Sequence, residues 1–251
     1  MNTGRFDIVL PEIDRMVWWS FDLETRVAQW ILDKYSASPE DSELIPKPSY
    51  GNTKKPEGRE AIRKNWYENQ LYLEAMNKSP MHAEPVCACF YNGEMEITLK
   101  IDYANPLQLQ REIWAVLLGN GPKDPILPII TAYGKGYDIP IMLNQSIAHD
   151  GLGTEGDGYV DYTNMRRYLK KDWDGTDQHH VDLCERFPES KAKGHSLNFL
   201  ASMFLGAQKL RKGSDVPILL KQGEKGLQLV CEYCLEDVRL TYAIGKKARL
   251  I

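Results

Sequence analysis

The chain has 251 residues, of which 43% are hydrophobic, so it can bury a sizeable core in one α/β domain with insertions. Its 31 basic and 35 acidic residues give a formal net charge of −4, which lacks the basic excess typical of proteins that only bind nucleic acid. The N-terminal residues contain no apolar run long enough for a signal peptide, and no stretch reaches the roughly 18 apolar residues of a membrane helix. These properties predict one domain over residues 1–251 in a soluble, cytoplasmic protein that does not engage a membrane.

Five cysteines occur along the chain: Cys87, Cys89, Cys184, Cys231 and Cys234. Because their number is odd and their spacing forms no regular framework, they favour a reducing compartment over a disulfide-bonded scaffold. Cys231-x-x-Cys234 has a spacing that occurs in zinc sites, but no second ligand pair lies at the spacing of a zinc finger. We therefore predict buried thiols with a structural role.

The first predicted strand covers Met16 to Phe21, a short apolar run without helical period that is bounded by charges. We expect this strand to end at Asp22. Residues Asp33 to Pro85 are rich in Pro, Lys, Glu and Asn, and they contain one predicted helix around Glu57 to Asn77. This segment is interpreted as an insertion after the first strand.

A β-hairpin is predicted next, from Val86 to Asn92 and from Glu94 to Asp102, because Asn92-Gly93 is a strong type I′ turn signal between two alternating strands. Apolar residues at helical spacing predict a helix from Gln108 to Leu118, which ends at Gly119. This helix is expected to cross over to a parallel strand from Ile126 to Thr131.

A helix is predicted from Asp138 to Ile147, after a turn at Gly134-Lys135-Gly136, because Pro140 is tolerated in a first helical turn. Two loops, Gly151 to Gly158 and Asp172 to Gln178, lie on either side of a basic helical segment. Asp138 is therefore expected at a strand-to-helix junction.

The last part of the chain predicts helices from Leu197 to Leu205 and from Leu227 to Lys247, joined by a basic, glycine-containing loop. The alternation of strands and helices along the chain predicts an α/β sheet with helices on both faces. In such sheets, sites form outside strand ends.

Acidic residues at these junctions have the composition of a site for divalent cations. Hydrolysis of a phosphodiester requires an activated water and neutralised phosphoryl oxygens, which two cations roughly 3.5–4 Å apart can supply. Mg²⁺ and Mn²⁺ prefer carboxylate oxygens. Asp22 and Glu24 are two residues apart in an extended strand, so both carboxylates point the same way. Tyr233 and Asp237 are one turn apart on the last helix and share a face.

Three of these segments resemble the exonuclease motifs of the DnaQ-like (DEDD) superfamily. Phe21 to Thr25 (FDLET) is similar to the first motif, Tyr137 to Pro140 (YDIP) to the second, and Tyr233 to Asp237 (YCLED) to the third. The tyrosine four residues before the last aspartate is typical of the tyrosine subgroup. The resemblance is closest to the proofreading domains of family B DNA polymerases and to their stand-alone relatives, and it covers roughly residues 16–247, apart from the insertion.

The resemblance implies an RNase H-like fold with a mixed sheet flanked by helices. It also implies that two Mg²⁺ or Mn²⁺ ions are held by four acids: Asp22, Glu24, Asp138 and Asp237. Tyr233 is expected to orient the attacking water, because a phenol with a pKa near 10 can hydrogen-bond that water without competing for the metal. Packing in the core is the alternative role for this side chain. The implied activity is 3′-5′ removal of nucleotides from DNA, with single-stranded 3′ ends as the expected partner.

Six residues are candidates for binding the substrate strand: Tyr133, Lys135, Arg166, Arg167, Lys209 and Arg211. Related polymerase domains usually have Asn where this chain has Tyr133, so stacking on a terminal base is expected to replace an amide hydrogen bond, at about 1–3 kcal/mol per base. The basic residues are expected either to follow the phosphate backbone or to form ordinary solvated surface.

The sequence also offers an aspartate and four histidines elsewhere in the chain as candidate site residues. Asp182 is expected either to assist metal or substrate binding indirectly or to cap a helix. The histidines lack ligand spacing and are interpreted as loop or capping residues: His149, His179, His180 and His195.

Two other functions remain open on the sequence. An exoribonuclease on the same fold is an alternative, because the four acids do not distinguish DNA from RNA. A module that binds nucleic acid or a protein partner without catalysis is another, with docking through the segment Asp33 to Pro85. Replication or repair proteins are candidate partners for either kind of nuclease.

Overall fold

The computed structural model describes residues 13–37, 48–69, 82–119, 126–148, 166–169, 179–190 and 193–251. No helix within these ranges is long and apolar enough to span a membrane. The predicted loops at 151–158 and 172–178 lie outside them, as do Lys170, Lys171 and the far part of the predicted helix 57–77.

A mixed five-stranded sheet with the order β3-β2-β1-β4-β5 forms the centre of the molecule. β1 pairs antiparallel with β2, and β2 with β3, whereas β4 and β5 run parallel to β1. The strands are β1 (Trp19–Val27), β2 (Ala83–Tyr91), β3 (Glu96–Lys100), β4 (Ile129–Thr131) and β5 (His180–Asp182). A separate small ribbon consists of β6 (Pro188–Ser190) and β7 (Lys193–Gly194).

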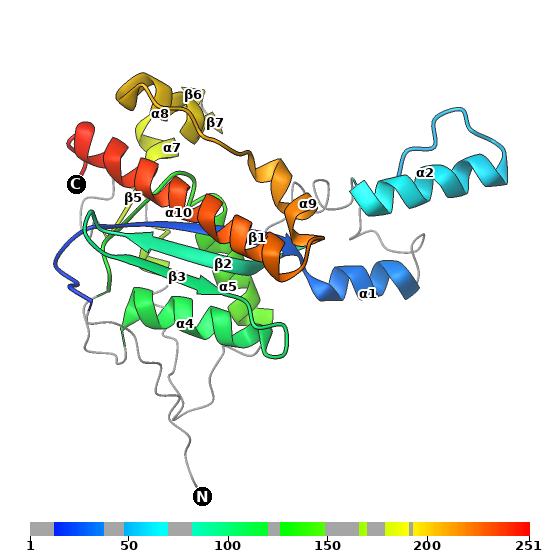
Figure 1. Cartoon of the computed structure of the whole chain (residues 1–251), viewed down its shortest axis with the longest axis horizontal. Coiled ribbons are helices and arrows are strands. Elements are labelled where there is room, and N and C mark those ends of the chain that lie inside the picture. The colour runs from blue at the N-terminus through cyan, green and yellow to red at the C-terminus, as the bar shows by residue number, and fades with distance from the viewer. Residues whose placement is uncertain are drawn as a thin grey trace, which may run out of the picture.

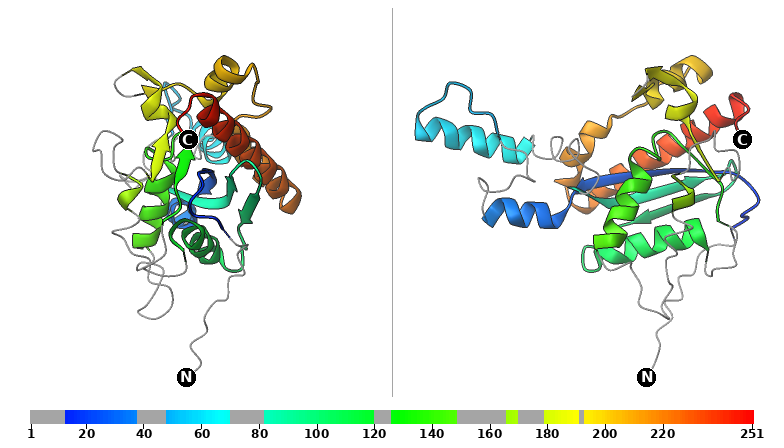
Figure 2. Two further views of the ribbon diagram at one scale, coloured as in Figure 1. Left: turned by 90° about the vertical axis from the view of Figure 1, so that its left-hand side faces the viewer. Right: turned by 180° about the vertical axis from the view of Figure 1, so that it is seen from behind.

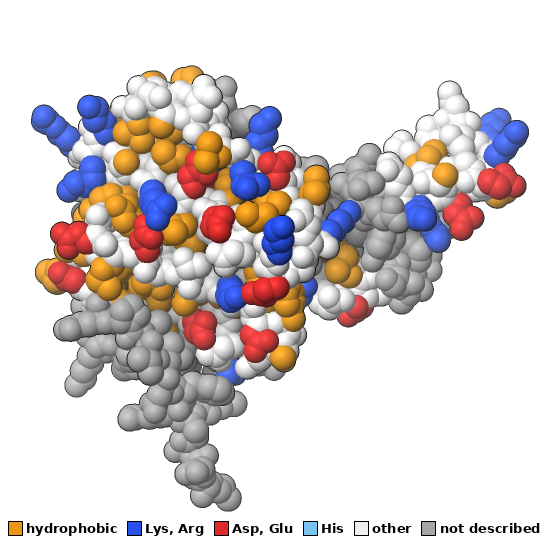
Figure 3. All heavy atoms as spheres, in the orientation of Figure 1, with side chains coloured by type: hydrophobic (Ala, Val, Ile, Leu, Met, Phe, Trp, Pro, Cys, Tyr) orange, Lys and Arg blue, Asp and Glu red, His pale blue; other side chains and the backbone are white. Residues whose placement is uncertain are grey.

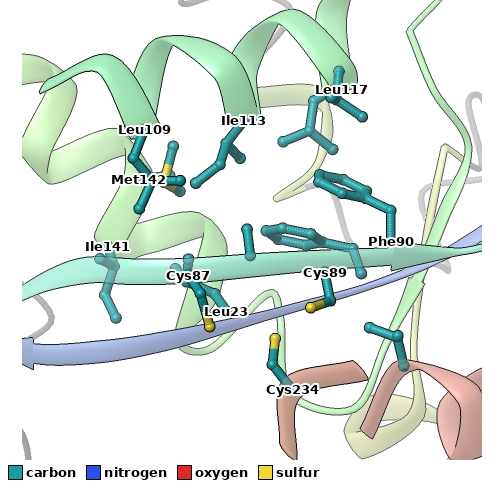
Figure 4. Packing of buried hydrophobic residues seen from close by; sticks show 14 of the residues in the cluster. Leu23, Cys87, Cys89, Phe90, Leu109, Ile113, Leu117, Ile141, Met142 and Cys234 are labelled. Carbon is teal, nitrogen blue, oxygen red and sulfur yellow. The ribbon is translucent and has the colours of Figure 1, made fainter. Parts of the chain in front are cut away.

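Helices cover both faces of this sheet, as the sequence predicts (Figure 1). α4 (Pro106–Leu118) and α5 (Asp138–Ala148) lie on one face, and α10 (Glu224–Lys247) crosses the other (Figure 2). Figure 4 shows Leu109 and Ile113 of α4 above the strands and Cys234 of α10 below them. Apolar side chains fill both interfaces, so α10 is held firmly against β1 and β2.

The sequence predicts that the first strand ends at Asp22, but β1 continues to Val27. The residues Leu23, Thr25 and Val27 are buried, whereas those between them are half-buried, which is the period-two pattern of a strand. The pairing of β1 with its parallel neighbour β4 stops just before Asp22, because β4 pairs with β1 at Trp19 and Ser20. The two acids therefore lie in mid-strand, beyond the end of β4.

The predicted hairpin is present, but its turn is not the two-residue type I′ turn. Tyr91 pairs with Glu96, so the loop has four residues, 92–95. The Asn92 side chain accepts hydrogen bonds from the backbone N–H groups of Glu94 (2.9 Å) and Met95 (2.7 Å). An asparagine whose side chain caps the following amides stabilises this longer turn.

α1 (Gln29–Ala37) and α2 (Pro56–Asn69) project sideways from the sheet (Figure 1). They have a small core of their own, in which Trp66 packs with Val27, Ala28 and Ile31. β2 begins at Ala83, so the last residues of the expected insertion, 33–85, belong to the sheet.

The chain between α8 (Leu197–Leu205) and α10 is not only the predicted loop. It contains a 3-10 turn (Gly213–Asp215) and the short helix α9 (Val216–Leu220). A short helix, α7 (Leu183–Arg186), also follows β5 directly. α8 has the predicted bounds. Ser196 caps its first turn through Phe199 N–H, and Gly206 ends it in the left-handed conformation.

Candidate active site

Carboxylates from the first strand and the last helix meet on the α10 face of the sheet. Asp22 and Glu24 are two residues apart in β1, so they point the same way, toward α10. Oxygen atoms of Asp22, Glu24 and Asp237 lie within 4.8 Å of one another. Three acids that are far apart in the sequence thus form one cluster.

Asp237 reaches this cluster because α10 packs tightly on the centre of the sheet. Val230, Cys234 and Val238 belong to the apolar core beneath the helix. The Cys234 thiol donates to the Asp22 carbonyl at 3.5 Å, which joins α10 to β1 beside the acid itself. Tyr233, one turn before Asp237, is 4% exposed and shares its helix face, as predicted.

Asp138 begins α5, at the strand-to-helix junction that the sequence predicts, and is buried. It is not part of the three-acid oxygen cluster. Its charge is nevertheless close, because burial and then the Asp22 carboxylate raise its pKa well above the ordinary value. Asp138 therefore lies near enough to Asp22 for the two charges to repel each other.

Burial and mutual repulsion make these acids hard to ionise. Burial raises the pKa of Glu24 well above its usual value, and the Asp22 and Asp237 charges raise it further. Burial and the Asp22 charge also raise the pKa of Asp237 to about 7. Since a nearby cation favours the ionised form of a carboxyl, this cluster needs positive charge to be fully ionised.

Lys209 supplies one such charge from the loop after α8. Its ammonium donates to Asp237 Oδ2 at 2.5 Å and to the Tyr233 hydroxyl at 2.9 Å, and it lies 4.7 Å from the centre of the Tyr233 ring. The loop is held on both sides, because Lys209 N–H donates to Asn198 Oδ1 (2.8 Å) and Leu210 N–H to Glu236 Oε1 (3.1 Å). The sequence predicts that Lys209 either follows the substrate backbone or belongs to the solvated surface, whereas in the structure it is paired with Asp237.

Positive charge is still lacking at two oxygen atoms of the cluster. Among the described residues, Asp22 Oδ2 and Asp237 Oδ1 are buried and accept no hydrogen bond. A buried carboxylate oxygen without a hydrogen-bond partner destabilises the fold, and carboxylate oxygens are the ligands that hard divalent cations prefer. The donor set therefore fits Mg²⁺ or Mn²⁺.

Asp182 was expected either to assist binding or to cap a helix, and it caps α7. Its Oδ1 accepts from Cys184 N–H and its Oδ2 from Lys135 N–H, both at 2.8 Å. Both oxygens are therefore engaged by backbone amides. His180, expected in a loop or at a cap, is a buried strand residue beside it.

Cysteines line the interface behind the acids. Cys87, Cys89, Cys231 and Cys234 are buried between β2 and α10, and Cys184 is half-buried. The prediction of buried structural thiols is confirmed for the first four. The pair on α10 meets a second pair, Cys87 and Cys89, that only the fold brings close. The Cys87 side chain hydrogen-bonds those of Cys231 and Cys234, but no cysteine belongs to a metal-compatible group in the described ranges.

The other predicted substrate-binding residues have varied surroundings. Tyr133 is 51% exposed, as a stacking residue must be. Lys135 pairs with Glu185 at 3.0 Å, and Arg167 contacts His179 Nε2 at 2.6 Å, so both have protein partners. Arg166 is exposed and Arg211 half-buried. On the face shown in Figure 3, basic and acidic side chains are interspersed.

No protein-family model and no curated protein matches the chain. The chain is similar to the solved structure of the family B DNA polymerase from the hyperthermophilic archaeon Pyrobaculum calidifontis, with a TM-score of 0.50 and 17% sequence identity. The similarity covers 92% of this chain and 24% of the polymerase chain, so this chain spans about a quarter of that length. It confirms the predicted fold class, an α/β mixed sheet with flanking helices of RNase H-like type.

Proposed function

We propose that the protein is a metal-dependent 3′-5′ exonuclease that hydrolyses phosphodiester bonds at the 3′ end of single-stranded DNA. The observation that carries the proposal is the cluster of Asp22, Glu24 and Asp237, in which two buried oxygens have no hydrogen-bond partner among the residues that the structure describes. The similarity in fold to a DNA polymerase supports a nucleic-acid substrate.

Four acids are proposed to hold two Mg²⁺ or Mn²⁺ ions. Asp22, Glu24 and Asp237 would hold one ion, and Asp22 and Asp138 the other, since the Asp22 charge acts on both Asp237 and Asp138. When bound, two such ions activate a water and neutralise charge on the phosphoryl oxygens and the leaving alkoxide.

Tyr233 and Lys209 are proposed to complete the site with hydrogen bonds. Burial and then the Glu24 charge raise the pKa of the Tyr233 hydroxyl, so it stays protonated and orients the attacking water without acting as its base. The Lys209 ammonium, already bonded to Tyr233 and Asp237, adds positive charge where the phosphoryl group gains negative charge.

A degradation assay tests this proposal. A 5′-labelled single-stranded oligonucleotide should shorten stepwise in Mg²⁺ or Mn²⁺ and stay intact in EDTA, with release of 5′-mononucleotides. The substitutions Asp22→Ala and Asp237→Asn should each lower the rate roughly 100-fold or more, because each removes a proposed metal ligand. Glu232→Gln is the matched control, since this acid lies exposed on the opposite face of α10.

The same assay with matched RNA and duplex DNA distinguishes the substrates. Faster cleavage of RNA would replace the DNA assignment with an exoribonuclease. Strand binding that persists in EDTA, without cleavage in any divalent metal, would replace it with a non-catalytic binding module.

A further inference from the structure

Two consecutive backbone amides hold the turn that leads into Asp138. Gly134 N–H donates to Thr131 Oγ1 at 2.9 Å, and Lys135 N–H donates to Asp182 Oδ2 at 2.8 Å. Thr131 is the last residue of β4 and Asp182 is the last residue of β5. Side chains at the ends of two adjacent parallel strands therefore accept hydrogen bonds from the same turn. We call Thr131, His180 and Asp182 the turn anchor.

His180 fixes the direction of the first of these bonds. Its Nδ1 lies 2.6 Å from the Tyr168 carbonyl, which can only accept, so Nδ1 carries the proton. Burial lowers the pKa of His180 to about 3, so the ring is neutral and Nε2 is an acceptor. Nε2 therefore accepts from the Thr131 hydroxyl at 2.8 Å, which leaves the Thr131 oxygen to accept from Gly134 N–H.

The anchored turn continues directly into the first turn of α5. The Gly134 carbonyl accepts from Ile139 N–H at 2.9 Å, and the Tyr133 carbonyl from Tyr137 N–H at 3.1 Å. A side chain at Gly134 would collide with Thr131, so the backbone lies directly against the anchor. The position of Asp138, between Tyr137 and Ile139, follows from these contacts.

We propose that the turn anchor positions Asp138 against Asp22 and so sets the affinity of the metal ion that these two acids share. The proposal rests on the proposed function. It gives Asp182 a role other than ligation, because both of its oxygens already accept backbone hydrogen bonds. All three anchor side chains are at most 2% exposed, so water cannot replace them readily.

The test compares Thr131→Val, which keeps the shape and removes the hydroxyl, with Thr131→Ser, which restores it. Mn²⁺ binding is measured by electron paramagnetic resonance, and amide hydrogen exchange is measured over residues 133–137. In Thr131→Val we expect faster exchange in this segment and about tenfold weaker binding of one of two Mn²⁺ ions, in the range typical of residues that orient ligands. Thr131→Ser should return both values to those of the wild type.

Ser146→Ala is the matched control, because it removes a buried hydroxyl from the other end of α5, where Ser146 bonds Trp114 and Met142. It should lower the melting temperature without changing either readout. If Thr131→Val leaves both amide exchange and Mn²⁺ affinity unchanged, the proposed role of the turn anchor is wrong. Equal weakening of the binding of both Mn²⁺ ions would also contradict it. A wild-type protein that binds no Mn²⁺ would overturn the proposed function instead, and the exchange result would still show whether the anchor holds the turn.

Discussion

Lys209 places one positive charge beside the acids of the candidate site. The Lys209 ammonium and the Asp237 carboxylate are 14% and 6% exposed, so both groups have little solvent around them. By contrast, Lys100 and Glu224 form an ion pair in which the side chains are 50% and 70% exposed. The two pairs offer a matched comparison of a buried and an exposed lysine.

Lys209→Met should destabilise the protein in EDTA at alkaline pH, because it leaves Asp237 buried without a counter-charge. Breaking a buried ion pair in this way costs up to about 3–5 kcal/mol, whereas Lys100→Met should cost much less because solvent screens the exposed pair. Urea unfolding measures both values. Added Mn²⁺ should recover much of the loss in Lys209→Met, and equal losses in the two variants would contradict this account.

Tyr233→Phe separates water orientation from metal binding. The phenol oxygen contacts Lys209 and Asp237 but is not itself a proposed ligand. We expect kcat to fall roughly 10- to 100-fold through misplacement of the attacking water, with KM and Mn²⁺ affinity nearly unchanged. Tyr242→Phe, on the same helix and against Tyr91, is the control in steady-state kinetics. A loss of Mn²⁺ affinity in Tyr233→Phe would assign the hydroxyl to metal binding instead.

Among the elements, the contact of α9 with α10 depends on one glycine. A side chain at Gly226 would collide with the backbone carbonyl of Leu219, which cannot turn away as a side chain can. Gly226→Ala should therefore lower the free energy of unfolding by about 1–3 kcal/mol or more. Gly213→Ala is the comparison, since among the described atoms its new methyl would meet the Tyr233 hydroxyl alone, at an ordinary contact distance of 3.7 Å. Denaturant midpoints that match in the two variants would show that α9 can move freely.

The long helices α4, α5 and α10 follow from sequence patterns, whereas the short elements β5, α7 and α9 do not. Apolar residues at helical spacing predict α8 and the C-terminal end of α10 correctly. β4 is the end of the predicted strand Ile126 to Thr131, whereas β5 has three residues, too few to show a period, and its pairing with β4 joins segments distant in the chain. The far half of β1 was missed because charged residues alternate with buried ones there. That alternation is itself the strand signal.

The acidic residues of the candidate site can be predicted from the sequence, but the residues that contact them cannot. Asp22, Glu24 and Asp237 lie in recognisable settings, and the structure brings them together. Lys209 precedes Asp237 by 28 residues in a loop without periodicity, so no local pattern indicates their contact. His180 likewise becomes a buried network residue only through the pairing of β4 with β5.

For the whole molecule, the buried acids link stability to pH and to metal. Asp237 and Asp182 have pKa values of about 7 in the fold, mainly through burial, against 3.8 for an ordinary aspartate. Between about pH 4 and pH 7 the folded protein keeps protons that the unfolded chain releases. The free energy of unfolding in EDTA should therefore fall as pH rises through this window.

Calorimetry in EDTA and in Mn²⁺ checks this linkage. A divalent cation binds the ionised acids, so Mn²⁺ should raise the melting temperature more at about pH 8 than at about pH 5, by roughly 2–4 °C for each kcal/mol of added stability. A melting temperature in EDTA that is highest at alkaline pH would contradict it.

The pairing of β1 with α10 also has a consequence for the order of events during synthesis. The Cys234 thiol and the Asp22 carbonyl that it contacts are 212 residues apart in the chain. Ribosomes add roughly 5–20 residues per second, so at least about ten seconds separate the first acid from the last. A nascent chain carries Asp22 and Glu24 long before Asp237 exists. An unfinished chain therefore cannot assemble the three-acid cluster, and the proposed nuclease activity depends on the completion of α10.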